Sequence, residues 1–323
     1  MKRQQGAALI AVLWLAAILA AIAFSIANTV RGETERTGTT TESVRSYYLA
    51  TGGLERALAY MEWGPSHRNP DNTPRYFENG MSRLNFRFPT GGVTVEVIPE
   101  SSKYDINTIA PPELVRLLGH LGVPAPRAEQ IAMAIVDWRS PAPAPGISFF
   151  DREYLAANPS FRARHASLEE TEELLLVKGM TPEIYHGSYV RDAAGRLQPR
   201  AGLKDCVSVY GSAGPFDINT VQPAVMQNLG IAPEMVALIQ QRRHARPFRN
   251  MSEVAPLAQF GGPGFSRLTV GGGNSIFTLR STARLRVGEN RFSDMTRTVS
   301  GLYKFHKAGY TPWIEVLRWY DSN

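Results

Sequence analysis

The chain has 323 residues, of which 43% are apolar and 20% charged, and its formal net charge is +6 at pH 7. This composition is that of folded protein, and the length is enough for two domains. The positive charge is dispersed and too mild to indicate nucleic-acid binding by itself. The single cysteine, Cys206, excludes an internal disulfide, and we expect it to be buried and inert.

Residues 7 to 27 form an apolar run that has no charge and only one hydroxyl group, that of Ser25. As a helix rising 1.5 Å per residue the run is about 31 Å long, which matches the roughly 30 Å hydrocarbon core of a bilayer. Lys2 and Arg3 precede it, and the positive-inside bias keeps this leader in the cytoplasm. The sequence therefore predicts a single-pass membrane anchor, with the chain after Ala27 on the side of the membrane opposite the cytoplasm.

Two interpretations of this N-terminus compete. One is an ordinary secretory signal peptide cleaved after Ala23, but its apolar region would normally have about 7 to 15 residues. The other is the leader of a type IV prepilin, which the short basic segment ending in Gly6 resembles. That resemblance implies cleavage between Gly6 and Ala7, N-methylation of Ala7, and retention of the helix. In prepilins the fifth mature residue is a Glu that pairs with the N-terminal amine of a neighbouring subunit, whereas here it is Ala11.

The next segment predicts a helix followed by two strands. We expect the helix to thin or bend near Gly32 and Gly38, because glycine is a poor helix former. Apolar residues then recur every three to four positions between Ser43 and Trp63, which indicates one buried stripe. The stretches 84–88 and 93–98 alternate apolar and polar residues, as strands with one buried face do. Gly52 and Gly53 favour a close contact between the helix and this sheet.

From Tyr104 to about Leu268 the apolar period is helical, and the block contains an internal repeat. Residues 104–109, YDINTI, recur as residues 216–221, FDINTV, and each copy leads through a Pro and an apolar helix to a Leu-Gly turn. We expect Asn-Thr to cap the following helix and the Gly to end it. Each unit is thus predicted to be a helical hairpin, with further helices at 168–177 and 252–259.

Alternating strand patterns return at 276–287, 292–305 and 313–319, with Gly288-Glu289-Asn290 as a hairpin turn. These three strands are predicted to join the earlier two in one antiparallel sheet. A lone N-terminal helix on such a sheet resembles the pilin architecture. The expected fold class is therefore α+β, with a pilin-like membrane helix on an antiparallel sheet and a large all-α insertion that contains two helical-hairpin repeats.

Together, the leader, Ala11 and the helical insertion resemble the K minor pseudopilin family of bacterial type II secretion systems from end to end. Residues 167–180, SLEETEELLLVKGM, match that family closely. The resemblance implies a leader at 1–6, a transmembrane and filament helix at 7–27, pilin-like parts at 28–103 and 272–323, and an inserted domain at 104–271. It implies a subunit at the pseudopilus tip that initiates assembly and acts in export of folded proteins across the outer membrane.

The same resemblance implies the partners of the chain. These are the other minor pseudopilins, above all the I and J types and then the H type, together with the major pseudopilin, the prepilin peptidase, the inner-membrane assembly platform and the outer-membrane secretin. In this family the loop between the repeats is acidic and is expected to hold calcium, which needs about six to eight oxygen ligands. Here Asp137, Asp151 and Glu153 are the only weak candidates, because Pro, Ala and Ser fill the intervening positions. We expect no cofactor, and weak or absent calcium binding.

The hairpins also resemble the helix-hairpin-helix module, which grips DNA phosphates, so a membrane-anchored DNA receptor is the alternative function. Against it, each turn has one Gly where the phosphate-binding form has two, and the flanking surfaces carry both charges. We therefore expect no nucleic-acid partner. No catalytic constellation stands out either, since the six histidines have no metal-ligand spacing, and the chain is predicted not to be an enzyme.

Overall fold

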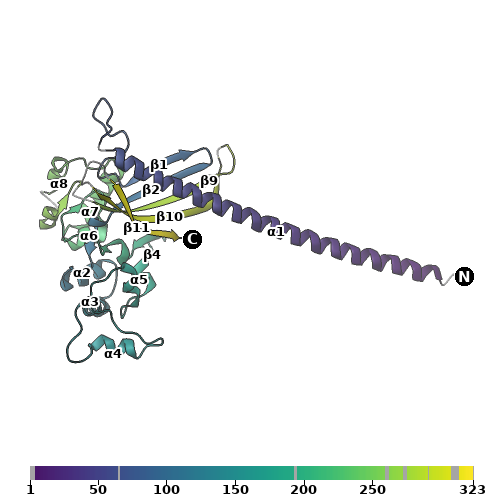
Figure 1. The fold of residues 1–323 in the computed structure, drawn as a ribbon, viewed down its shortest axis with the longest axis horizontal. Helices are drawn as coiled ribbons and strands as arrows, with labels where there is room; N and C mark the ends of the chain where they lie inside the picture. Colours follow the sequence, from purple (N-terminus) through teal and green to yellow (C-terminus); the bar gives the residue numbers. More distant parts are fainter. Residues whose placement is uncertain are drawn as a thin grey trace.

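α1 (Gln4–Trp63) is one unbroken helix, whose first half stands clear of the rest of the protein (Figure 1). The computed structural model describes residues 4–64, 66–192, 195–258, 262–271, 275–289, 291–306 and 313–322. The second half of α1 packs on a sheet, and an inserted block of helices and short strands extends from this body to one side of α1 (Figure 1).

The expected bend near Gly32 and Gly38 does not occur. Each glycine costs about 1 kcal/mol of helix propensity relative to Ala, but it keeps the backbone N–H that a proline would remove. The threonines of this segment also bond within the helix, because their hydroxyls donate to the carbonyl four residues earlier at 2.8–3.0 Å. These are Thr29, Thr34, Thr39 and Thr40. The local sequence therefore weakens the helix without breaking it.

The sheet has five antiparallel strands in the order β1-β2-β9-β10-β11. Their bounds are Arg83–Phe88, Gly91–Pro99, Ile276–Arg286, Phe292–His306 and Trp313–Ser322. Val93, Val95 and Val97 of β2 are buried on the face that α1 covers, while the intervening residues are half-buried on the other face. The predicted antiparallel sheet, built from two strands before the insertion and three after it, is confirmed.

α1 approaches this sheet most closely at Gly53. A Cβ at Gly53 would lie 2.3 Å from Val93 Cγ1 and 2.8 Å from Ser281 Oγ, whereas one at Gly52 would meet nothing within 4 Å. Ser281 Oγ also donates to the Ala50 carbonyl at 2.7 Å. The predicted close contact is therefore made by Gly53 and not by Gly52.

The insertion has a hydrophobic core of its own, which is distinct from the core between α1 and the sheet. Its helices are α2 (Pro111–His120), α3 (Ala125–Arg139), α4 (Phe149–Leu155), α5 (Pro182–His186), α6 (Pro223–Asn228), α7 (Pro233–Ala245) and α8 (Ala255–Ala258). The predicted helix at 168–177 is a 3-10 turn at Thr171–Leu176. α4 lies at the end of the insertion farthest from the sheet (Figure 1).

The insertion is not all-α, which corrects the prediction. β3 and β7 are two-residue strands at the start of the two repeats, and they pair in parallel with β6 and β8 respectively. β4 and β5 pair antiparallel as a hairpin. The bounds are Tyr104–Asp105, Val207–Ser208, Phe216–Asp217, Leu268–Thr269, Gly187–Arg191 and Leu197–Ala201. The paired segments are too short, or too exposed along their length, to show an alternating apolar pattern.

The two repeats fold alike, as α2–α3 and α6–α7. Gly122 and Gly230 end the first helix of each with positive φ angles of 82° and 87°, a conformation that favours glycine. The next residue reaches back to the helix in both copies: Val123 N–H donates to the Leu118 carbonyl, and Ile231 N–H to the Met226 carbonyl. The predicted hairpins and their glycine turns are confirmed.

Candidate functional site

The first half of α1 is an exposed apolar surface. Its large side chains from Leu9 to Ile26 are 51–70% exposed, and the helix is long and apolar enough to cross a membrane by length and composition. Ala11 lies on this exposed stretch, and Gly6 and Ala7 lie in the first turns of α1. Such a surface is stable only in lipid or against other apolar helices.

Asn107 and Asn219 hold equivalent positions in the two repeats, and each side chain bonds the backbone of a distant residue. Asn219 Nδ2 donates to the Phe248 carbonyl at 3.0 Å, and Phe248 N–H donates to Asn219 Oδ1 at 2.8 Å. Asn107 makes the same two bonds with Leu168, at 3.0 and 2.7 Å. Each asparagine therefore ties the segment after its hairpin to the start of the repeat.

The expected capping role of these asparagines is wrong. The residues before α2 and α6 are Ala110 and Gln222, and neither helix has a side-chain cap. A proline at the start of each helix removes one of the free N–H groups that a cap would satisfy. The asparagine side chains are thus available for the long-range bonds.

The arginines that close the second helix of each repeat point into the insertion. Arg243 Nη1 donates to two backbone carbonyls at 3.1 and 2.8 Å, and Arg139 likewise bonds two carbonyls. The acceptors are Ile218 and Val221 for Arg243, and Ile106 and Ile109 for Arg139. Both guanidinium groups are therefore used to hold the start of their own repeat.

The turn amides are also used internally. Gly122 N–H donates to the Gly119 carbonyl at 2.8 Å, and Gly230 N–H to the Gln227 carbonyl at 2.9 Å. At the first turn the side chain of Arg200 lies so close that a Cβ on Gly122 would be 2.3 Å from its Nη1 atom. Neither turn offers the free amide nest that phosphate binding needs, which argues against the DNA receptor.

Each of the three candidate calcium ligands already interacts with other groups of the protein. Asp137 Oδ2 accepts from Ser148 Oγ at 2.8 Å, and Glu153 Oε2 lies 2.7 Å from Lys178 Nζ. Asp151 is buried and caps α4 together with Ser148, whose Oγ accepts from Asp151 N–H at 3.0 Å. Among the residues that the structure describes, no three His, Cys, Asp or Glu side chains converge on a point where a metal ion could bind. The carboxylates therefore do not fit a calcium cage.

His165 lies at the centre of this loop, with acceptors at both ring nitrogens. Its Nε2 is 2.9 Å from Asp151 Oδ2, and its Nδ1 is 3.1 Å from the Ser140 carbonyl and 3.2 Å from the Asp137 carbonyl. Because both nitrogens face oxygen acceptors, the site favours the imidazolium form, in which both nitrogens carry a proton. The side chains of His165 and Asp151 are only 10% and 3% exposed.

The pKa values of this pair shift in the directions that such a bond requires. Burial works against the charge on each group, but the Asp151 hydrogen bond raises the pKa of His165 above its ordinary value. The hydrogen bonds from His165 and from the Ala163 amide lower the pKa of Asp151 in turn. When His165 is protonated, its positive charge lies beside the carboxylate of Asp151.

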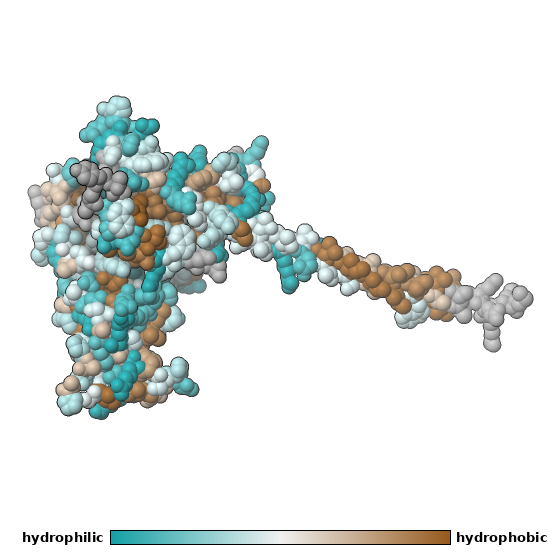
Figure 2. Space-filling view, in the orientation of Figure 1, coloured by the Kyte–Doolittle hydropathy of each residue, from teal (hydrophilic) through white to brown (hydrophobic). Residues whose placement is uncertain are grey.

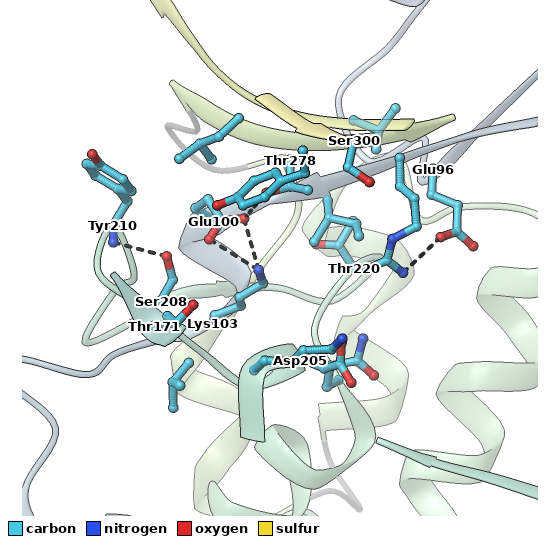
Figure 3. A pocket seen from close by; sticks show the side chains of 18 of the residues that line it. Glu96, Glu100, Lys103, Thr171, Asp205, Ser208, Tyr210, Thr220, Thr278 and Ser300 are labelled. Carbon is cyan, nitrogen blue, oxygen red and sulfur yellow. Dashed lines mark hydrogen bonds and ion pairs between the residues drawn. The ribbon is translucent and has the colours of Figure 1, made fainter. Parts of the chain in front are cut away.

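A polar cleft of about 570 Å³ separates the uncovered face of the sheet from the insertion (Figure 3). Glu100 lies at its wall, where it accepts from Lys103 Nζ at 2.9 Å and from Thr278 Oγ1 at 2.6 Å. Further out, Glu96 is paired with Arg280 at 3.4 Å. Arg318 of β11 forms an ion pair with Glu170 of the insertion. The Arg318–Glu170 pair joins the insertion to the sheet directly, and the bonds of Glu100 hold the segment that leads into the insertion against β9, so the cleft is a joint between the two cores.

Sequence reasoning missed His165, Glu100 and Lys103. The partner of His165 is 14 residues away, and Thr278, which bonds Glu100, is 178 residues away. No motif or period links positions at such separations. Cys206 is buried as expected, and burial raises the pKa of its thiol, so it stays protonated and unreactive at neutral pH.

Comparisons with known proteins agree with this architecture. A family model described as type II secretion system (T2SS), protein K matches residues 98–187. A protein from Klebsiella pneumoniae named type II secretion system protein K is 23% identical over 270 residues, which cover 78% of each chain. That family is a component of a secretion system and is not a known class of enzyme.

A solved structure resembles the whole fold. It is a chain in the crystal structure of the GspK-GspI-GspJ complex from the type 2 secretion system of enterotoxigenic Escherichia coli. The two share a TM-score of 0.54 at 21% identity, and the match covers 89% of this chain and 99% of that one.

Proposed function

We propose that this chain, which is similar to protein K of type II secretion systems, belongs to that family and is the minor pseudopilin at the tip of the pseudopilus. There it initiates filament assembly and acts in the export of folded proteins across the outer membrane. The helix-hairpin-helix DNA receptor is not proposed, because the turn amides and the repeat arginines are occupied within the insertion.

Ala11 is the observation that carries this proposal. It stands where prepilins have the Glu that pairs with the terminal amine of the subunit already in place. The next acidic residue along α1 is Glu33, about 33 Å further at 1.5 Å per residue. Pairing of charges matters among apolar helices, where an unpaired charge is costly. A subunit without this carboxylate gains nothing by docking beneath another, yet its amine can still receive the next subunit.

The insertion supports the same position. Its roughly 165 residues form a globule with a radius of gyration near 15 Å, and it extends to one side of α1 (Figure 1). Repeated along a close-packed shaft, such a globule would collide with its neighbours. At the free end of the filament it has space to meet the secretion channel or the cargo.

The proposal includes partners and a location. By analogy with the GspK-GspI-GspJ complex, this chain assembles with minor pseudopilins of the I and J types, and then with the H type and the major pseudopilin. α1 spans the inner membrane once, with its leader in the cytoplasm for the prepilin peptidase and the assembly platform, and the folded part in the periplasm facing the secretin. No cofactor is part of this function.

Labelling of intact pseudopili tests the placement. Antibody or gold label on this chain should mark one end of each filament, and deletion of the chain should abolish filament initiation. Copies spaced regularly along the shaft would contradict the proposal. Ala11→Ser, which also lacks a carboxylate, is the matched control and should leave the label at the end.

A further inference from the structure

β11 is a long edge strand of the five-stranded sheet. It is the last strand of the sheet, and among the described residues no backbone hydrogen bond joins it to a strand other than β10. The opposite edge, β1, has six residues and carries Arg83 and Arg87. β11 has ten residues and neither Lys nor Pro, and its register against β10 shifts once, at Leu317. The segments on either side of that shift are regular, so another strand can pair with them.

One face of β11 is apolar and lies beyond the reach of α1. Val316 pairs with Tyr303, and Trp319 with Gly301, so both side chains lie on the face of the sheet that α1 covers. α1 packs on β2, β9 and β10, and leaves Val316 58% and Trp319 41% exposed. In Figure 2 brown apolar surface gathers where Figure 1 places β11.

The charged side chains near the middle of β11 lie on the other face and are held there. Glu315 is 2.9 Å from His306 Nε2, and Arg318 pairs with Glu170 of the insertion. The face that bears Val316 and Trp319 therefore presents apolar groups beside an outer edge that no other strand among the described residues pairs with. Another β-strand can form backbone hydrogen bonds with such an edge. Apolar side chains on that strand would pack against the apolar face of β11.

We propose that β11 is the docking edge for a β-strand of a different pilin-like subunit, which extends this sheet. The inference rests on the proposed function, because it takes its partner from the same minor-pseudopilin complex. A second copy of this chain does not fit as an antiparallel partner. Two β11 strands paired antiparallel are related by a two-fold axis normal to the sheet, so their α1 helices would point in opposite directions and could not share one membrane.

The test uses the full chain, co-expressed with the I-type and J-type subunits and extracted in detergent. Val316→Lys and Trp319→Lys place a charge on the apolar face, and each should weaken the recovered complex about tenfold or more, as loss of a central contact does. Leu197→Lys is the matched control, because Leu197 is also an exposed strand residue, 60% exposed, but belongs to β5 of the insertion. It should leave the complex intact, and thermal melts should show all three variants folded.

A photo-crosslinking residue at position 316 identifies the partner. An adduct with an I-type or J-type subunit supports the docking edge, whereas an adduct with a second copy of this chain, or none, overturns it. If wild type and both lysine variants form the complex equally well, the edge is wrong while the proposed function stands. If the wild-type chain forms no complex with either subunit, the proposed partnership fails and the docking edge fails with it.

Discussion

The contact between His165 and Asp151 makes the stability of the loop depend on pH in a known direction. The pKa of His165 is raised, so its contribution is fully present below its ordinary value of 6.5 and is lost as pH rises through the folded-state pKa. The pKa of Asp151 is lowered, so its contribution is present above 3.8 and is lost as pH falls through the folded-state pKa. The pair therefore contributes fully to stability between about pH 3.8 and pH 6.5.

We expect the melting temperature to fall as pH is raised from 6 towards 9, because His165 loses its proton. His165→Gln should remove most of the decrease that is due to this deprotonation. At pH 6 this substitution should cost about 3 kcal/mol, since it leaves a buried carboxylate unpaired. His244→Gln, at an exposed histidine, is the control. Thermal melts measure both effects, and an NMR titration that placed the pKa of His165 at or below 6.5 would contradict the prediction.

The same residues predict the response to calcium. Since Asp137, Asp151 and Glu153 are bound by Ser148, His165 and Lys178 respectively, we expect the melting temperature to be the same in calcium and in chelator. Any ligand that binds only the folded state raises the melting temperature. A large rise at micromolar calcium would therefore show that the loop rearranges to bind the ion.

At the scale of the elements, the packing of α1 on the sheet depends on one glycine of an adjacent pair. Gly53→Ala should destabilise the protein by about 1–3 kcal/mol, because the added carbon overlaps Val93 and Ser281 in a packed core. Gly52→Ala meets open space and should stabilise it by up to about 1 kcal/mol through helix propensity. Thermal melts of this matched pair check the packing, and equal effects would refute it.

The hairpin repeats illustrate which elements local sequence predicts well. The YDINTI and FDINTV segments, their prolines and their Leu-Gly turns specify the order and ends of the helices, because φ and helix period are local properties. The role of Asn107 and Asn219 was predicted wrongly. Their partners, Leu168 and Phe248, are 61 and 29 residues away, and only the folded insertion brings them together.

At the scale of the whole molecule, the continuity of α1 is relevant to where the N-terminal leader is cleaved. α1 runs without a break from Gln4 into the core, so the exposed apolar half of the helix and the half packed in the folded body are one element. We expect the mature chain to begin at Ala7 and Gly6→Val to block cleavage, with mass spectrometry of the membrane-extracted protein as the measurement. A mature N-terminus at Phe24 or Asn28 would return the chain to the class of ordinary signal peptides.

The sequence by itself determined the anchor, the five alternating strands, the two helical hairpins and the family they resemble. Each of these depends on periodicity or turn chemistry within a short segment. Only the tertiary structure decided that Asp151 is paired with His165, that Glu100 joins the segment before the insertion to β9, and that β11 is left uncovered beside α1. Those contacts depend on where distant segments meet, and that depends on how the two cores pack.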